Sequence, residues 1–148
     1  MGYGVPAAIG AKLAKPNKDI WAITGDGGFQ MNMQELGTII HYKIPIKIII
    51  LNNSFLGMVK QWQDLFFEKR LAYTYLKNPD FSKIANAFGI KAKRAAFWTE
   101  AVKAIQWANS IKNETVLVEF LINPNEHVYP MLPPGKSLSV DFHFLEYG

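Results

Sequence analysis

The sequence predicts an α/β protein, a three-layer sandwich with a mostly parallel sheet and helices on both of its faces. Short runs of β-branched residues alternate along the chain with segments of helical periodicity. Two of those runs, KIIIL and TVLVEFLI, are almost continuously apolar, which is typical of strands covered on both faces. Strands that alternate with helices usually pair in parallel through right-handed crossovers, and this order therefore predicts the fold class.

The pattern places the individual strands and helices. The strands are expected at 20–24, 47–51, 90–95 and 115–122. The helices are expected at 5–15, 31–42, 80–88 and 99–111. Pro6 suits the first turn of the first helix, and Pro16 lies beyond its end. Asp80 and Thr99 can cap the last two helices, and Gly89 can end the third.

The chain of 148 residues has the length of one domain. We expect an α/β domain over residues 1–123 and a C-terminal tail over residues 124–148 that wraps over it. Four of the eight prolines fall in this tail, where the alternation of strands and helices ends. The chain also begins directly beside a helix start, as MGYGVP, so we expect it to be a piece of a longer protein.

Composition and charge argue against several classes of function. The net charge is +4 and the basic residues are scattered, which indicates a solvated surface rather than a nucleic-acid site. No apolar run reaches the length of a membrane span, because Lys47 interrupts the candidate IPIKIIIL, and no signal peptide is visible. The chain has no cysteine, which excludes disulfides and thiolate metal sites and fits a cytoplasmic location. The three histidines have no partner at metal-ligand spacing, so zinc is not expected.

The stretch from Gly25 to Asn53 carries the main functional signal. Asp26 follows the first predicted strand and Asn53 follows the second, with one predicted helix between them. A right-handed crossover of this length returns the chain to the same edge of the sheet, where open α/β sheets bind ligands. We therefore expect the carboxylate and the carboxamide to lie close together.

The glycines around Asp26 predict a diphosphate site. Gly25, Gly27 and Gly28 form a turn that exposes backbone N–H groups at the start of a helix, which suits an anion. The turn contains no Lys or Arg, and a carboxylate would repel a phosphate unless a cation lay between them. A carboxylate, an amide oxygen and phosphate oxygens form the hard oxygen shell that Mg²⁺ prefers. The stretch thus predicts a metal that holds a diphosphate.

Other interpretations of the glycines are weaker. A dinucleotide fingerprint needs glycine where the chain has Gln30, and an acidic residue near the position where it has Asn52 and Asn53. A Walker A loop ending in GKS would need glycine at the position of Pro130. A purely structural tight turn stays open as an alternative at this point.

Longer motifs give the sequence a family resemblance. GDG is followed by 24 residues and then NN, which resembles the thiamine diphosphate motif. MGYGVPAAIGAKLAKP, GDGGFQMNMQEL, LNNSFLGMVKQWQ and HVYPMLPPGKSL together resemble the C-terminal domain of the acetolactate synthase (acetohydroxyacid synthase) catalytic subunit. The resemblance extends to about Leu138 and implies the thiamine diphosphate-binding fold. GMVKQWQ and HVYPM are the parts that point to this enzyme rather than to other thiamine enzymes.

The resemblance implies roles for individual residues. The ligands of Mg²⁺ would be the Asp26 carboxylate, the side-chain oxygen of Asn53 and the backbone carbonyl of Phe55. Met58 and Trp62, on one predicted helix, would line the substrate channel. The full set of cofactor-binding residues that the resemblance implies is Met1, Gly2, Gly25, Asp26, Gly27, Gly28, Asn53, Phe55, Gly57 and Met58.

The resemblance also implies chemistry and partners. Thiamine diphosphate would supply a carbanion and an electron sink, Mg²⁺ would anchor it, and FAD would be bound in the full-length enzyme. That enzyme would decarboxylate pyruvate and join the hydroxyethyl unit to a second 2-ketoacid, as a transferase of branched-chain amino-acid biosynthesis. A homodimer or higher oligomer is expected, with the aromatic segment 61–70 near the dimer interface and a regulatory subunit as a further partner.

In the family, a glutamate on a different domain activates the cofactor. Glu35 is a tempting substitute in this chain, but we interpret it as a helix residue needed for packing or capping. We therefore expect the isolated chain to be inactive as a synthase. Trp98 and Trp107 are interpreted as core or helix-packing residues.

Two other functions stay open from the sequence. The chain could be the same domain of another thiamine diphosphate enzyme: pyruvate oxidase, glyoxylate carboligase or a 2-ketoacid decarboxylase. It could also be a non-catalytic α/β assembly module that kept the fold and lost the cofactor. The presence of both Asp26 and Asn53 argues against the module.

Overall fold

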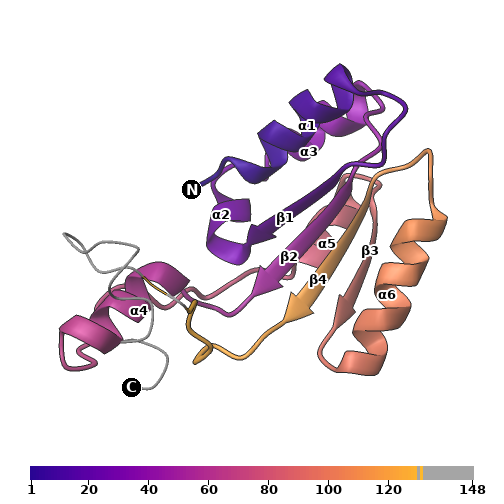
Figure 1. Ribbon diagram of the computed structural model, residues 1–148. Helices are drawn as coiled ribbons and strands as arrows, with labels where there is room; N and C mark the ends of the chain where they lie inside the picture. Colours follow the sequence, from indigo (N-terminus) through magenta and orange to yellow (C-terminus); the bar gives the residue numbers. More distant parts are fainter. Residues whose placement is uncertain (130, 132–148) are drawn as a thin grey trace.

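Four parallel strands form one sheet in the order β1-β2-β4-β3 in the computed structural model, which describes residues 1–129 and 131. The strands are β1 (Trp21–Gly25), β2 (Lys47–Asn52), β3 (Lys91–Ala95) and β4 (Val116–Leu121). Each pair of neighbours is parallel, so the carboxyl ends of all four strands lie at the same edge of the sheet (Figure 1). The predicted α/β fold with a parallel sheet is confirmed, and each strand begins within one residue of its predicted start.

The helices lie between the strands, as the alternation predicts. They are α1 (Gly4–Ala14), α2 (Asp26–Gln30), α3 (Glu35–His41), α4 (Gly57–Phe66), α5 (Phe81–Ala87) and α6 (Trp98–Ser110). The Asp80 cap of α5 is confirmed, because its carboxylate accepts a hydrogen bond from the Lys83 backbone N–H at 3.0 Å.

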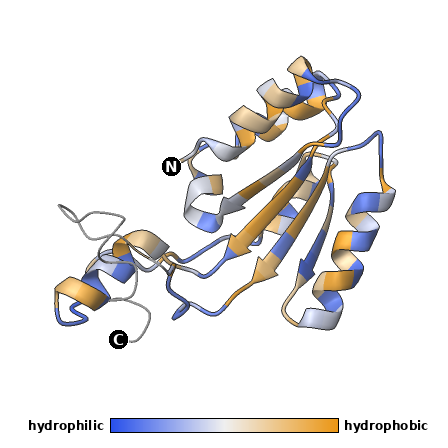
Figure 2. Ribbon diagram, in the orientation of Figure 1, coloured by the Kyte–Doolittle hydropathy of each residue, from blue (hydrophilic) through white to orange (hydrophobic). Residues whose placement is uncertain are grey.

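Each face of the sheet packs against its own hydrophobic core. Helices α1, α3 and α5 pack on one face, where Ile48 and Ile50 of β2 point, together with Phe29 and Leu117. Helix α6 packs on the other face against Ile49 and the alternate residues of β4. Figure 2 shows the central strands β2 and β4 as largely hydrophobic and the edge strand β3 as largely hydrophilic. The continuous apolar runs of the sequence are therefore the two central strands, which are covered on both faces.

The helix predicted over 31–42 is present as α3, but it begins at Glu35 rather than at residue 31. The chain forms α2 directly at Asp26, then a turn, and only then α3. In the turn, the N–H groups of Asn32, Glu35 and Leu36 each bond to the carbonyl three residues back, rather than four. The Asn32 side chain donates to the Gly2 carbonyl, and this contact with the N-terminal segment accompanies the interruption of the helix.

The predicted cap of the last helix is wrong. Helix α6 begins at Trp98, so Thr99 lies inside its first turn. The Glu100 carboxylate accepts hydrogen bonds from the N–H groups of Ala96 at 2.9 Å and Phe97 at 3.3 Å. Glu100 therefore caps the start of α6, which was the role predicted for Thr99.

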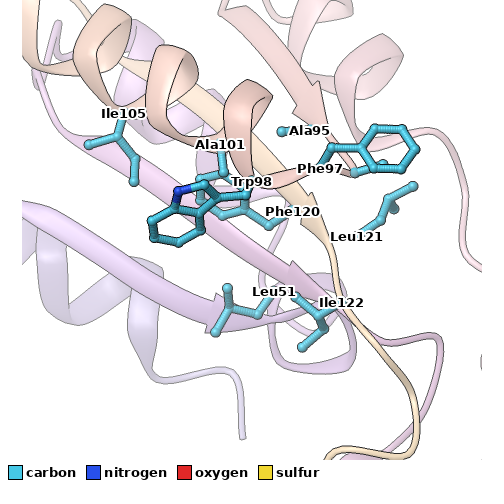
Figure 3. Close-up of a pocket in the computed structure, with 10 residues that line it drawn as sticks. Leu51, Ala95, Phe97, Trp98, Ala101, Ile105, Phe120, Leu121 and Ile122 are labelled. Carbon is cyan, nitrogen blue, oxygen red and sulfur yellow. The ribbon is translucent and has the colours of Figure 1, made fainter.

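Trp98 is not a core residue, contrary to the prediction, because 81% of it is exposed at the start of α6. Trp107 of the same helix packs against the second core, as predicted. Beside α6 lies an apolar hollow lined by residues that include Leu51, Phe97, Trp98 and Ile105 (Figure 3). None of the described helices is long and apolar enough to cross a membrane.

Helix α4 stands away from the sheet, beyond the carboxyl ends of the strands (Figure 1). Two backbone hydrogen bonds of 2.8 Å, Leu56 N to Thr74 O and Leu76 N to Ser54 O, tie the chain before it to the chain after it. Gln61 of α4 exchanges two hydrogen bonds with the backbone of Val128. The first residues of the predicted tail therefore contact α4, while most of the tail lies outside the described residues.

Candidate functional site

The register of β1 and β2 positions the two halves of the predicted site. Gly25 pairs with Leu51, so the next residues along the two strands, Asp26 and Asn52, are neighbours at the edge of the sheet. The backbone N–H of Ser54 donates to Asp26 Oδ2 at 2.9 Å. Asp26 and Asn53 therefore lie at the same edge, as predicted from the crossover. Their role as metal ligands stays a prediction.

The Asp26 carboxylate is held asymmetrically. It is only 2% exposed, and its Oδ2 accepts a second hydrogen bond, at 2.6 Å, from the Asn78 side-chain amide. No hydrogen bond from residues 1–129 or 131 reaches the other oxygen, Oδ1. The hydrogen bonds to Oδ2 leave Oδ1 without a donor among the described residues, and a cation at this edge of the sheet could contact it.

The two asparagines of the NN pair differ in how their oxygens are used. Asn52 Oδ1 accepts from the Ser54 N–H at 3.0 Å and from Asn78 Nδ2 at 2.8 Å. Among the described residues, Asn53 Oδ1 accepts a hydrogen bond only from the Phe55 N–H, at 3.0 Å. An amide oxygen has two lone pairs, so Asn53 keeps one for a ligand and Asn52 does not. This difference supports Asn53, rather than Asn52, as the predicted ligand.

The glycine turn is closely packed. A Cβ at Gly27 would lie 2.9 Å from Leu56 Cδ2 and 3.0 Å from Leu76 Cδ1, and a Cβ at Gly28 would lie 3.0 Å from Thr24 Oγ1. Met1 and Gly2 are also near these positions, so the structure brings the predicted residues of the turn together. Because α2 has only five residues, individual N–H groups rather than a helix field would contact an anion here.

The remaining predicted residues lie on or near α4. A Cβ at Gly57 would come within 2.9 Å of Asn53 Nδ2, so the glycine lets α4 start close to the NN pair. Met58 is about half exposed, and the Trp62 ring packs on Phe66 at 5.0 Å. These side chains are not part of either core of the sheet. Their assignment to a substrate channel stays a prediction.

Glu35 is the first residue of α3, and its carboxylate accepts from the Thr38 hydroxyl at 2.8 Å. This local contact agrees with the interpretation of Glu35 as a helix residue. Among the described residues no three His, Cys, Asp or Glu side chains gather as a metal site would require. A metal at this edge would therefore depend on mixed carboxylate, amide and carbonyl oxygens.

Sequence reasoning missed a group of buried polar residues behind the site. Glu119 of β4 is completely buried, accepts from Asn52 Nδ2 at 2.7 Å, and pairs with Arg94 Nε at 2.7 Å. The hydrogen bond to Glu119 raises the pKa of the Arg94 guanidinium above its usual value. A signal was available in the sequence, because VLVEFL places one acidic residue in an otherwise apolar strand. Asn78 gave no comparable signal.

The comparisons with known proteins agree with the geometry. The family described as thiamine pyrophosphate enzyme, C-terminal TPP binding domain, matches residues 1–120. The acetolactate synthase large subunit of Haemophilus influenzae is 48% identical over 140 residues, which are 94% of this chain and 24% of that protein. The mitochondrial acetolactate synthase of Schizosaccharomyces pombe is 49% identical over 138 residues, 93% of this chain and 20% of that protein. The chain thus spans about a quarter of the length of these relatives.

A solved structure shows the same fold. The thiamine diphosphate-dependent 4-hydroxybenzoylformate decarboxylase of Rhodococcus jostii aligns over 83% of this chain and 23% of its own, with a TM-score of 0.76 and 28% identity. The family match over residues 1–120 includes Asp26 and the NN pair. The chain therefore belongs to the thiamine pyrophosphate enzyme family, as its C-terminal TPP-binding domain.

Proposed function

We propose that this chain is the cofactor-binding domain of an acetolactate synthase catalytic subunit. The enzyme would be a carboligase that decarboxylates pyruvate and transfers the hydroxyethyl unit to a second 2-ketoacid, in branched-chain amino-acid biosynthesis. Support comes from the acetolactate synthase relatives, which are 45–49% identical over nearly the whole chain. A cytoplasmic location is part of the same proposal, and a chain without cysteine is compatible with such a reducing compartment.

The donor set fits Mg²⁺ and a diphosphate. Within the described part of the chain, Asp26 offers a carboxylate oxygen that accepts no hydrogen bond, and Asn53 offers an amide oxygen that accepts one. The Phe55 carbonyl would complete the protein ligands, and the N–H groups around Gly27 and Gly28 would contact the diphosphate. Hard oxygen ligands of this kind are those that Mg²⁺ prefers. Thiamine diphosphate, when bound, supplies a carbanion and an electron sink for decarboxylation.

The observation that carries the metal-binding part of the proposal is that Asp26 Oδ1 accepts no hydrogen bond from the described residues. FAD and the activating glutamate would be held by other parts of the enzyme, so we expect this chain alone to have no synthase activity. The orientation of the cofactor would depend on Met1 and Gly2, which lie beside the glycine turn. Met58 and Trp62 would select the second ketoacid from α4.

Calorimetric titration with thiamine diphosphate, with and without Mg²⁺, tests the cofactor part of this proposal. We expect binding that requires the metal and that the change Asp26→Ala abolishes. Glu114→Gln, which changes an exposed carboxylate before the start of β4, at the other end of the sheet from the NN pair, is the control and should bind as the unchanged chain does. Metal-independent binding, or full binding by Asp26→Ala, would contradict the proposed ligand role.

A different reaction on the same cofactor is the second candidate. The solved structure of similar fold is a decarboxylase, although at only 28% identity. A panel of 2-ketoacids given to the full-length enzyme separates the candidates. Acetolactate formed from pyruvate supports the proposal, while aldehyde as the sole product would favour the decarboxylase.

A further inference from the structure

A continuous hydrogen-bonded chain of side chains connects the edge strand β3 to Asp26, across β4 and β2. It runs from Arg94 of β3 to Glu119 of β4, to Asn52 of β2, to Asn78, and finally to Asp26 of α2. We call these five residues the polar chain. All of its hydrogen bonds are between 2.6 and 2.8 Å. Four separate segments of the sequence besides α2 therefore contribute to the position of one carboxylate.

Each link of the polar chain permits only one arrangement of donors and acceptors. Glu119 accepts at both oxygens, from Arg94 Nε and from Asn52 Nδ2. Asn52 must then turn its oxygen toward Ser54 N and Asn78 Nδ2. Asn78 uses its amide nitrogen for both Asn52 and Asp26, while its oxygen accepts from Gln30 Nε2 at 2.7 Å. The charge at Glu119 thus sets the direction of every amide between it and Asp26.

The last link decides which oxygen of Asp26 is free. Asn78 and the Ser54 N–H both donate to Oδ2, so Oδ1 is left without a hydrogen bond from the described residues. A carboxylate held by one oxygen presents the other in a fixed direction. Protein groups that hold metal-binding carboxylates in this way change metal affinity by about 10- to 100-fold when they are removed.

We propose that Glu119 and Asn78 are positioning residues, which act through the polar chain to hold the Asp26 carboxylate ready for the metal of the diphosphate. This inference rests on the proposed function, since it concerns the same metal. In this role, neither residue binds the metal or the cofactor itself. Glu119 acts across β2, through Asn52, and Asn78 acts directly on Asp26.

The change Glu119→Gln tests the direction of the polar chain. A glutamine has one donor end, which would face either the Arg94 guanidinium or the Asn52 amide nitrogen. If Asn52 turns to accept from the new amide, its nitrogen faces the Ser54 and Asn78 donors, and their bonds are lost. We expect the dissociation constant of Mg²⁺, measured by calorimetry at saturating thiamine diphosphate in the full-length protein, to rise about 10-fold or more.

Two further variants keep the test independent of folding. Asn78→Ala removes the last donor at a half-buried position, so the fold should tolerate it, and the same rise in the dissociation constant is expected. Glu114→Gln removes an exposed carboxylate of the salt bridge to Lys91, before the start of β4, and should leave the constant unchanged. The double variant with Glu119→Gln and Asn78→Ala should be no weaker than the worse single variant, because both act through one route.

A purely structural role predicts a different result. In that case the variants would lower the free energy of unfolding of the metal-free protein, while Mg²⁺ affinity well below the melting temperature would stay as it was. Unchanged affinity in both Glu119→Gln and Asn78→Ala, with the Asp26→Ala variant still unable to bind, would overturn this inference and leave the proposed function intact. Failure of the unchanged protein to bind Mg²⁺ with thiamine diphosphate would overturn both.

Discussion

Asp19 illustrates how a single residue holds a buried charge in this fold. Its carboxylate accepts from Lys47 Nζ at 3.0 Å and from Lys112 Nζ at 2.8 Å. The Lys47 side chain is only 2% exposed, although it lies on the central strand β2. Within the part of the chain that the structure describes, Asp19 is the one carboxylate paired with Lys47. A buried ammonium needs such a partner, so Asp19 compensates the charge that interrupts the apolar run of β2.

We predict a pH-dependent loss of stability that is specific to Asp19. The hydrogen bond from Lys112, followed by that from Lys47, lowers the pKa of the Asp19 carboxyl to about 2. A lowered pKa stabilises the fold fully above the unfolded value near 4, and this stabilisation is lost as the pH falls through the folded value near 2. Asp19→Asn should therefore be less stable than the unchanged chain at neutral pH, with the difference shrinking as the pH falls below about 4.

Urea unfolding at a series of pH values measures this difference. The double variant with Asp19→Asn and Lys47→Met is the control, because it also removes the buried cation and should recover much of the lost stability. A difference between Asp19→Asn and the unchanged chain that stays constant down to the lowest measurable pH would contradict the explanation.

At the scale of elements, α2 places Asp26 at the carboxyl-end edge of the sheet. It is too short to be stable by itself and is held by Phe29, which is 1% exposed and contacts the Phe81 ring edge-on at 5.5 Å. Phe81 is the first residue of α5 and follows the segment that carries Asn78. One aromatic contact therefore holds together two of the segments that position Asp26.

We predict that Phe29→Ala affects both stability and binding. Loss of a buried phenylalanine should lower the free energy of unfolding by about 3–5 kcal/mol. Because α2 also carries Asp26, the affinity for Mg²⁺ and thiamine diphosphate should fall as well. Ile39→Ala is the matched control, since Ile39 is equally buried in the same core but lies on α3, where the structure shows no contact with the polar chain. It should cost about 2–5 kcal/mol in stability and leave affinity unchanged well below its melting temperature.

The elements also show which features can be predicted from the sequence. The strands and the shared edge of Asp26 and Asn53 follow from local patterns, namely apolar runs and the length of a crossover. The break between α2 and α3 does not, because it coincides with a contact between Asn32 and Gly2 from a distant part of the chain. The role of Asn78 is equally hidden, since it contacts Asp26 across 52 positions of sequence, with α3, β2 and α4 in between. Glu119 could have been found as a lone acidic residue in an apolar strand.

At the scale of the whole molecule, the structure leaves apolar surface exposed in two places. One is the α6 face of the sheet, where Phe97 and Trp98 are exposed beside the hollow of Figure 3. The other is the end of α4 and the segment after it, where Phe66, Phe67, Leu71, Tyr73 and Tyr75 are exposed. Contiguous apolar surface of this kind is typical of sites that contact another protein surface.

We propose that the α4 surface pairs with a second copy of the chain. It lies at the carboxyl-end edge of the sheet, on the same side as Asp26, so a second copy placed there would also shield the cofactor edge from water (Figure 1). Aromatic residues are enriched at such interfaces, and Phe66 already packs on Trp62, which gives the surface a fixed shape.

The prediction is a concentration-dependent dimer that the double change Phe66→Ser and Phe67→Ser shifts to monomer. Both residues are exposed, so the variant should fold with nearly the stability of the unchanged chain. Sedimentation equilibrium over a range of concentrations measures the association, and circular dichroism checks the fold. Phe97→Ser and Trp98→Ser, on the α6 face, form the control pair, and their association should match that of the unchanged chain. Dissociation by the control pair, with the α4 variant still dimeric, would assign the contact to the α6 face instead. The same result would contradict the proposal that the α4 surface contacts a second copy of the chain.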